Sequence, residues 1–208
     1  MKLFLRVSMA FLLFAMSALA FAAAAAPMPI EIVRTTTDNV LERVKSDKET
    51  LRAEPGKMYA LVSEHIFPHF DFAIMAQWVL GDSWAGADET TRAAFVDQFR
   101  KLLVRTYATA LLEFSDQSIS YPDSEIAPAA TTATVKQEIS QPGSSSIPIV
   151  YRLHNKTGEW KVFDVSVDGV SLIKTYRASF AAAIKNDGLP ALVQSLETKN
   201  QKYAAQAQ

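Results

Sequence analysis

The sequence predicts an α+β domain in which a helical N-terminal half packs on a twisted antiparallel sheet and two helices follow the sheet. Up to Phe114 the apolar residues recur at intervals of three and four, which is typical of amphipathic helices. After Phe114 apolar and polar residues alternate, as they do in antiparallel strands. The helical spacing returns at Ser171. One run of strands between two runs of helices indicates the α+β class.

Residues 1–26 have the composition of a secretory signal peptide. Lys2 and Arg6 form a positive n-region, Val7 to Phe21 is an apolar core, and the alanine run that follows offers A-x-A cleavage sites. The apolar core is too short and wrongly flanked for a membrane span, so a retained N-terminal anchor is the weaker alternative. The chain has no Cys, which excludes a lipoprotein anchor. We therefore expect residues 27–208 to form one exported domain.

The charge of the predicted mature chain is small. Residues 27–208 keep all 22 acidic residues and 19 of the 21 basic ones, so the formal charge is −3. This balance argues against nucleic acid as a partner and against strong electrostatic binding to membranes. Without Cys there is no disulfide, and the stability of the fold must come from packing.

The first segment of the mature chain, from Pro29 to about Arg52, is predicted to be one helix. Its apolar stripe consists of Ile30, Val33, Val40, Leu41, Val44 and Leu51. Glu54-Pro55-Gly56 breaks this helix, and Pro55 suits the first turn of the next one. Pro68 ends that second helix, because the residue before a proline avoids the α region.

A short, densely apolar helix comes next. Asp71 is placed to cap a helix over Phe72–Leu80, and Gly81 is placed to close it. Such a dense apolar surface needs either the core or a ligand to cover it. The residues that form it are Phe67, Phe70, Phe72, Ile74, Met75, Trp78, Val79, Leu80 and Trp84.

The longest predicted helix runs from about Asp88 to Glu113. Its apolar stripe covers roughly half of the circumference, which is wider than the arc of about 100° that one core face requires. Either the helix packs on two neighbours, or one edge packs in the core while the other lines a cavity. The stripe consists of Phe95, Phe99, Leu102, Leu103, Tyr107, Ala110, Leu111 and Phe114.

Four segments have strand composition: Ile119–Tyr121, Ala130–Ile139, Ile147–Asn155 and Trp160–Val167. The turn sequence Gln141-Pro142-Gly143-Ser144 separates the second from the third. Pairing Leu153 with Lys161 in an antiparallel hairpin assigns side chains to two faces. The expected core or cavity face has Ile149, Tyr151, Leu153, Phe163, Val165 and Val167. The other face has Val150, Arg152, His154, Trp160, Val162 and Asp164.

The C-terminal part begins with the Asp168-Gly169 turn, which ends the last strand. Ser171 can then cap a helix with an apolar face of Leu172, Ile173, Tyr176, Phe180 and Ile184. Gly188 is expected to end this helix, and Pro190 to open a last helix over Leu189–Lys202.

Candidate catalytic or metal-binding residues are few. His65 and His69 have a metal-ligand spacing, but Pro68 interrupts their helix, and two ordinary histidines in a turn are the simpler interpretation. Asp164 and Asp168 could form a carboxylate pair, although the hairpin register instead places Asp164 beside Arg152. The sequence has no nucleotide-binding or nucleophile motif of a known enzyme class. We therefore expect no metal, no cofactor and no enzymatic activity.

The stretch from Trp160 to Arg177 resembles the signature of the MlaC family of periplasmic phospholipid-binding proteins, also known as toluene-tolerance (Ttg2-type) proteins. The matching residues are Trp160, Lys161, Asp164, Asp168, Gly169, Val170, Ser171, Leu172, Ile173, Tyr176 and Arg177. A second similar block comprises FDFAIMAQWVLGDSW followed by RAAFVDQFRKLLVRTYATAL, and the two blocks stand in the family's order.

The resemblance implies a cystatin- or NTF2-like cone of strands around an apolar lipid cavity. It also implies a soluble periplasmic carrier, expected to be a monomer with phospholipid as its cargo. The implied partners are an outer-membrane lipoprotein–porin complex and an inner-membrane ABC transporter, and the implied role is maintenance of outer-membrane lipid asymmetry. Two alternatives are a periplasmic small-molecule enzyme with Asp164 in its cavity, and a protein-interaction module with an exposed groove or sheet edge.

On this hypothesis, apolar residues of the short helix, the long helix, the hairpin and the signature helix would contact the acyl chains. They are Met75, Trp78, Val79, Phe95, Phe99, Leu102, Leu103, Tyr107, Tyr151, Leu153, Phe163, Val165, Val167, Leu172, Ile173 and Tyr176. Lys174 and Arg177 are either an ordinary solvated face or the cations that meet a phosphate head group.

Overall fold

The computed structural model describes residues 27–115, 117–122, 126–127 and 129–206. The predicted signal peptide, residues 1–26, lies outside this range. In chain order the elements are α1 (Pro29–Ser46), α2 (Lys48–Ala53), α3 (Pro55–His65), the 3-10 helix η1 (Phe67–His69), α4 (Phe72–Leu80), α5 (Asp82–Gly86), α6 (Glu89–Leu112), β1 (Ser118–Ser120), β2 (Thr132–Ser140), β3 (Ile147–His154), β4 (Lys161–Val167), β5 (Val170–Ser171) and α7 (Leu172–Gln206). Within these ranges no helix combines the length and the apolar character that crossing a bilayer requires.

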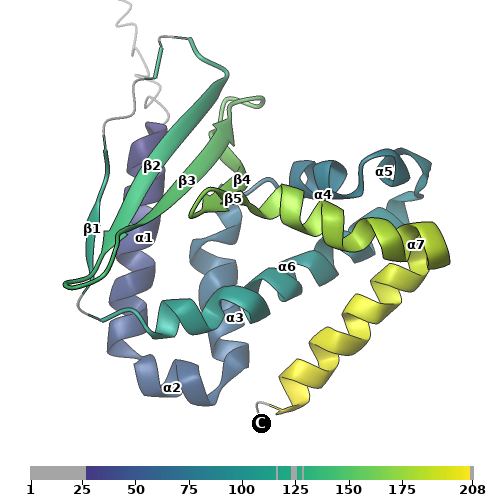
Figure 1. Ribbon diagram of the computed structural model, residues 1–208, viewed down its shortest axis with the longest axis horizontal. Coiled ribbons are helices and arrows are strands. Elements are labelled where there is room, and N and C mark those ends of the chain that lie inside the picture. Colours follow the sequence, from purple (N-terminus) through teal and green to yellow (C-terminus); the bar gives the residue numbers. More distant parts are fainter. Residues whose placement is uncertain (1–26, 116, 123–125, 128, 207–208) are drawn as a thin grey trace, which may run out of the picture.

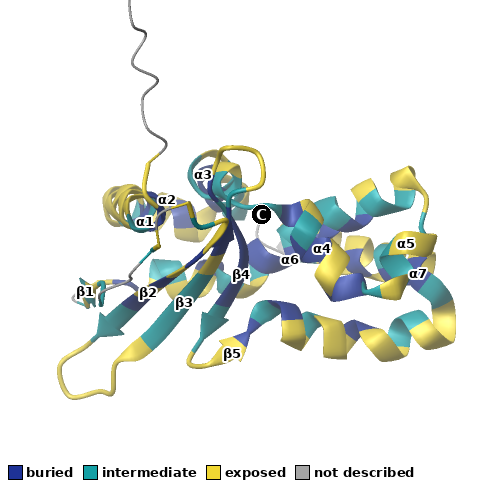
Figure 2. Ribbon diagram, turned by 90° about the horizontal axis from the view of Figure 1, so that it is seen from above, coloured by how far each residue is buried: buried dark blue, intermediate teal, exposed yellow. Residues whose placement is uncertain are grey.

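The predicted α+β class is confirmed. Five antiparallel strands form one sheet in the order β1-β2-β3-β4-β5, so each strand pairs with its neighbours in the chain. Figure 1 shows α1 running beside the sheet, with α3 and α6 below it and α4, α5 and α7 gathered at the other end of the molecule. Figure 2 shows that the buried residues concentrate where the strands meet the helices.

The single helix predicted over residues 29–52 is wrong in one respect: α1 ends at Ser46 and α2 begins at Lys48. Asp47 breaks the helical path with φ −114° and ψ 18°, and its carboxylate pairs with Arg43 at 2.8 Å. The break lets Leu51 turn back into one apolar cluster with Val44 of α1 and with residues of α3 and α6. No proline or glycine marks this break in the sequence. The turn is therefore favoured by tertiary packing rather than by local propensity.

The predicted cap at Asp71 is confirmed, because its carboxylate accepts from Ile74 N–H at the start of α4. The structure adds a second cap, since the Asp88 carboxylate accepts from Thr91 N–H at the start of α6. Asp71 also contacts the sheet, because its second oxygen lies 3.0 Å from His154 Nε2. This contact fixes α4 against the sheet end.

The C-terminal helical segment is bent as predicted. Gly188 inside α7 has φ 83° and ψ 166°, so α7 consists of two helices that meet at this residue. Only glycine adopts this φ without strain, and Pro190 follows in the first turn of the second helix. In Figure 1 the second half of α7 doubles back beneath α6.

The predicted hairpin register is wrong. Tyr151 pairs with Val165 and Arg152 with Asp164, but Leu153 pairs with Val162, which leaves Phe163 as the extra residue of a β-bulge. Because side chains alternate between faces, the extra residue reverses the expected faces at this end of β4. Trp160 and Val162 pack toward α1, whereas Phe163 lies beside Arg152 on the opposite face.

Candidate ligand cavity

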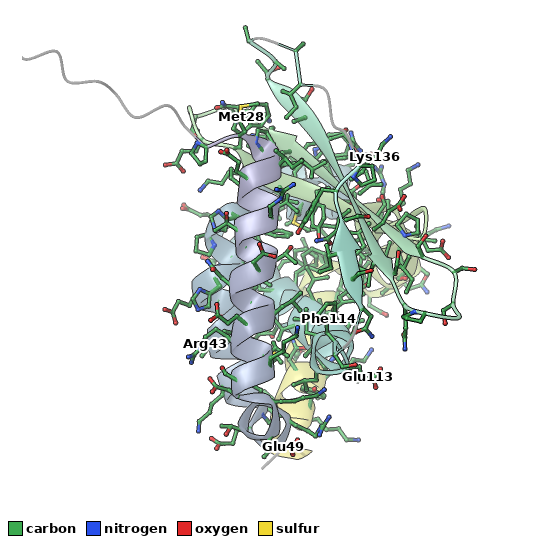
Figure 3. The ribbon with its side chains drawn as sticks, turned by 90° about the vertical axis from the view of Figure 1, so that its left-hand side faces the viewer. Met28, Arg43, Glu49, Glu113, Phe114 and Lys136 are labelled. Carbon is green, nitrogen blue, oxygen red and sulfur yellow. The ribbon has the colours of Figure 1, made fainter. Side chains whose placement is uncertain are left out.

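A cavity of about 400 Å³ lies between α1, α6 and the inner face of the sheet. This volume is within the range typical of small-molecule pockets. The α6 wall consists of Leu103, Val104, Tyr107, Ala108, Ala110 and Leu111, continued by Phe114. The sheet wall consists of Ile119, Gln137, Ile139, Ile147, Ile149, Tyr151, Val162, Val165 and Val167. In Figure 3 Phe114 lies between α1 and the strands, whereas Lys136 lies on the side of the sheet away from α1.

Sequence reasoning missed the wall that α1 contributes. Its residues are Ile32, Val33, Thr36, Thr37, Val40 and Leu41. The apolar stripe of this helix was visible in the sequence, but a stripe alone does not show whether a core or a cavity covers it. The chain between α3 and α4 was also missed as a wall, and it contributes Ile66, Phe67, His69 and Phe70.

The wide apolar stripe of α6 is divided between two environments, as the second of the two sequence interpretations expected. Phe95, Phe99 and Leu102 pack in a core cluster with α4 and α7. Leu103, the next residue after Leu102, lines the cavity together with Tyr107 and Leu111, which follow at intervals of four. Leu103 belongs to both environments, because it also touches the core cluster.

The residues expected to contact an apolar ligand fall into two groups. Seven of them line the cavity: Met75, Leu103, Tyr107, Tyr151, Val165, Val167 and Leu172. The other nine lie outside the lining. Of these, Val79, Phe95, Phe99, Leu102, Leu153 and Ile173 are buried in core clusters, and Tyr176 packs against one of those clusters. Trp78 and Phe163 contact each other on the outer side of the sheet.

Four polar groups form a hydrogen-bond network in the apolar wall. Gln137 is 2% exposed, and its Nε2 donates to the hydroxyls of Thr37 (3.1 Å) and Tyr121 (3.0 Å). The Tyr151 hydroxyl donates to Gln137 Oε1 at 2.8 Å. The network joins α1 to β2 and β3 while satisfying a buried amide. It also sets the spacing between two walls of the cavity.

The two phenols of the lining are held in their neutral form. Burial, with a smaller contribution from Tyr121, raises the pKa of Tyr151 above its usual value. Burial, followed by the neighbouring Tyr176, raises the pKa of Tyr107 to about 12. A phenol is neutral at physiological pH in any case, and the desolvation here extends the neutral form to more alkaline pH. This arrangement suits an apolar ligand.

The histidine pair is split by the structure, since His69 lines the cavity and His65 does not. Burial, followed by the charge of Lys161, lowers the pKa of His69. Both influences favour neutral imidazole. Within the described part of the chain, no three His, Cys, Asp or Glu side chains gather closely enough to hold a metal ion.

Asp164 lies outside the cavity lining and serves the start of α7. Its carboxylate accepts from the Ser171 hydroxyl at 2.8 Å and from Ile173 N–H at 3.3 Å. Arg152 Nη1 is 3.7 Å from the same carboxylate, so the predicted proximity is confirmed, although Ser171 and the helix terminus are the closer partners. Asp164 therefore joins β4 to α7.

Asp164→Asn should lower the free energy of unfolding by about 1–3 kcal/mol, because a buried charge-assisted contact is lost. Occupancy of the cavity by an apolar ligand, per folded molecule, should be unchanged, because Asp164 lies outside the lining. Chemical denaturation and ligand quantification of the same preparation check both results. A stable Asn variant that had lost function would contradict the structural role of Asp164 and favour a catalytic one.

The lining includes two exposed residues. They are Ala110 on α6 and Ile147, which is 47% exposed at the start of β3. Lys174 and Arg177, the two cations considered for a head group, are exposed and are absent from the lining. The structure therefore does not bring them to the cavity wall.

The structure is that of an α+β cavity protein, in which helices and one face of an antiparallel sheet surround an apolar cavity. Comparison with known proteins identifies the family. The sequence profile of the family described as "MlaC protein" matches residues 34–198. The chain belongs to the MlaC family.

Three relatives illustrate the match. The chain is 28% identical over 165 residues to the "Toluene tolerance protein ttg2D" of Pseudomonas putida, covering 79% of this chain and 76% of that protein. It is 23% identical over 181 residues to the "Intermembrane phospholipid transport system binding protein MlaC" of Haemophilus influenzae, covering 86% and 83%. A phospholipid-binding protein from Ralstonia solanacearum, solved in complex with a phospholipid, superposes with a TM-score of 0.77 at 31% identity, covering 84% of this chain and 98% of that one.

Proposed function

We propose that this protein is a periplasmic phospholipid carrier whose cavity between α1, α6 and the sheet holds acyl chains. The observation that carries the proposal is the lining itself, which is formed almost entirely by aliphatic and aromatic side chains. Its described residues include no Asp, Glu, Lys or Arg. The phospholipid found in the Ralstonia relative supports the same ligand class.

Energetics explain why such a carrier needs a cavity rather than a surface groove. Each CH₂ group kept from water is worth about 0.8 kcal/mol, so two chains of about 16 carbons represent on the order of 25 kcal/mol. A carrier exchanges this ligand with membranes only if its cavity offers nearly the same stabilisation as the bilayer. The direction of transport must then come from a partner that uses ATP.

Family membership supports a proposal for the route and the partners. We propose that residues 1–26 export the chain, and that residues 27–208 act as a single domain in the periplasm. There the protein would carry phospholipid between an outer-membrane lipoprotein–porin complex and an inner-membrane ABC transporter, and so maintain outer-membrane lipid asymmetry. Its one ligand is the cargo, and it performs no chemistry on it.

Two observations favour a carrier over the alternative functions. Asp164, the carboxylate that an enzyme would use, is engaged with Ser171 and Ile173 outside the cavity lining. The apolar walls enclose a cavity between sheet and helices, whereas a peptide-binding module would present an open groove or sheet edge.

A transfer experiment tests the proposal. Protein loaded with isotope-labelled phospholipid would be mixed with the ABC transporter complex in nanodiscs, and label in each fraction would be followed over time. We expect label to move between protein and nanodisc while the protein stays folded and soluble. Folded protein that neither accepts nor releases phospholipid would refute the carrier function.

A further inference from the structure

We propose that the outer surface around Trp78 is a docking site for an acidic face of a partner protein. We define the Trp78 surface by the exposed side chains of Trp78, Arg152, Lys174 and Arg177. The buried Phe163 ring lies beneath Trp78 and Arg152. The inference rests on the proposed function, because a carrier must bind the proteins that load and unload it. It goes further by assigning a surface and the charge of its partner.

Trp78 supplies an aromatic anchor. It is 47% exposed, and the other large apolar side chains that are exposed in the described structure are the aliphatic Met28, Ile147 and Val170. The Trp78 ring lies 5.8 Å from the Phe163 ring and 5.8 Å from Arg152 Cζ. These contacts hold the indole in place, so little side-chain entropy is lost when a partner covers it.

Arg152 places a cation beside this anchor. Its guanidinium stacks 4.8 Å above the Phe163 ring and its side chain is 45% exposed. The neighbouring Asp164 is 3.7 Å away, and that carboxylate accepts its shorter hydrogen bonds from Ser171 and Ile173. A guanidinium has five N–H donors, so most of them remain available to an external carboxylate.

Arg177 and Lys174 add two more cations next to α4. The Arg177 guanidinium lies over Gly81, the residue that ends α4 three positions after Trp78, and a Cβ built on Gly81 would be 3.0 Å from Arg177 Nη2. Lys174 stands one helical turn before Arg177, on the same side of α7. Neither cation forms an ion pair within the described chain, and Asp82, which follows Gly81, does not neutralise them by a direct contact.

A fixed tryptophan beside Arg152, with Arg177 over the end of the same helix and Lys174 one turn before Arg177, fits a protein better than a bilayer. Trp and Arg dominate the residues that carry protein–protein binding energy, and opposite charge on the partner fixes register and speeds encounter. Arg152 alternates along β3 with the lining residue Tyr151, so the Trp78 surface lies on the opposite face of the sheet from the cavity. The acyl chains therefore do not need this surface as their exit.

The test compares two variants with a matched control. Trp78→Ala removes the anchor, Lys174→Glu reverses a charge on the Trp78 surface, and Lys199→Glu makes the same charge change on the exposed far half of α7. Each lipid-loaded protein is measured against the purified ABC transporter complex and against the lipoprotein–porin complex, at several salt concentrations. Bound phospholipid and melting temperature are recorded for every variant.

We expect Trp78→Ala and Lys174→Glu to weaken binding to at least one complex by about tenfold or more. Lys199→Glu should bind like the wild type, and Lys174→Glu should flatten the salt dependence. Three results would overturn the docking proposal. They are equal binding by all variants, no binding of the wild type to either complex, and the same losses of binding when phosphatidylglycerol vesicles replace the protein complexes. A wild-type chain that retained no phospholipid would instead count against the carrier function.

Discussion

Replacing Leu103 or Val165 by tryptophan is expected to empty the protein of phospholipid while leaving it folded. Both side chains lie in the cavity lining, on opposite walls, where an indole would occupy the space of an acyl chain. A folded protein with little or no bound lipid is the expected product. Phospholipid per folded molecule, measured beside the melting temperature, checks this result.

Leu153→Trp is the matched control for this experiment. Leu153 is fully buried and packs in a core cluster outside the lining. An indole there would press on core side chains and would not displace a ligand. Overpacking a core commonly costs about 1–3 kcal/mol. We expect this variant to lose stability without a selective loss of lipid. If Leu103→Trp also unfolded the protein without yielding a lipid-free folded state, the cavity would be misplaced.

Phe99→Ala is expected to cause the largest loss of stability among truncations of α6. Phe99 is fully buried, stacks on Phe95 and meets Tyr176 edge to face, so its removal leaves a void in a packed cluster. Truncating such a side chain typically costs about 3–5 kcal/mol. Unfolding in urea, followed by circular dichroism, measures this loss.

Leu103→Ala is the comparison on the same helix. One side of Leu103 faces the cavity, where lipid or water can take up the volume that the side chain leaves. We expect it to cost less than the ~2–5 kcal/mol of a Leu→Ala change in a closed core. Equal losses for Leu103→Ala and core Leu→Ala changes such as Leu102→Ala would show that the α6 stripe is core throughout.

Local signals were enough to predict most of the fold. The cap at Asp71, the Asp168-Gly169 turn and the bend at Gly188 depend on backbone conformations that few residue types favour, and all three were predicted correctly. The break at Asp47 was not, because nothing in its immediate neighbourhood disfavours a continuous helix.

The site was less predictable than the fold, and Phe163 shows the reason. A single bulge between Val162 and Asp164 moves Phe163 to the outer face and Val162 to the cavity wall. The sequence pattern marks both residues as apolar, but nothing in it indicates that one residue is extra to the strand pairing. Likewise, the stripe of α1 indicated burial, whereas only the tertiary arrangement shows that Val40 and Leu41 face a cavity.

The most direct test of the central claim is the amount of phospholipid bound to the purified mature protein. The protein would be extracted with organic solvent, its lipids identified by mass spectrometry, and the delipidated, refolded chain offered phospholipid in donor vesicles. We expect phospholipid to co-purify with the native protein and to be taken up again by the delipidated one. Fully folded protein that is isolated without lipid and takes up none from the vesicles would contradict the account.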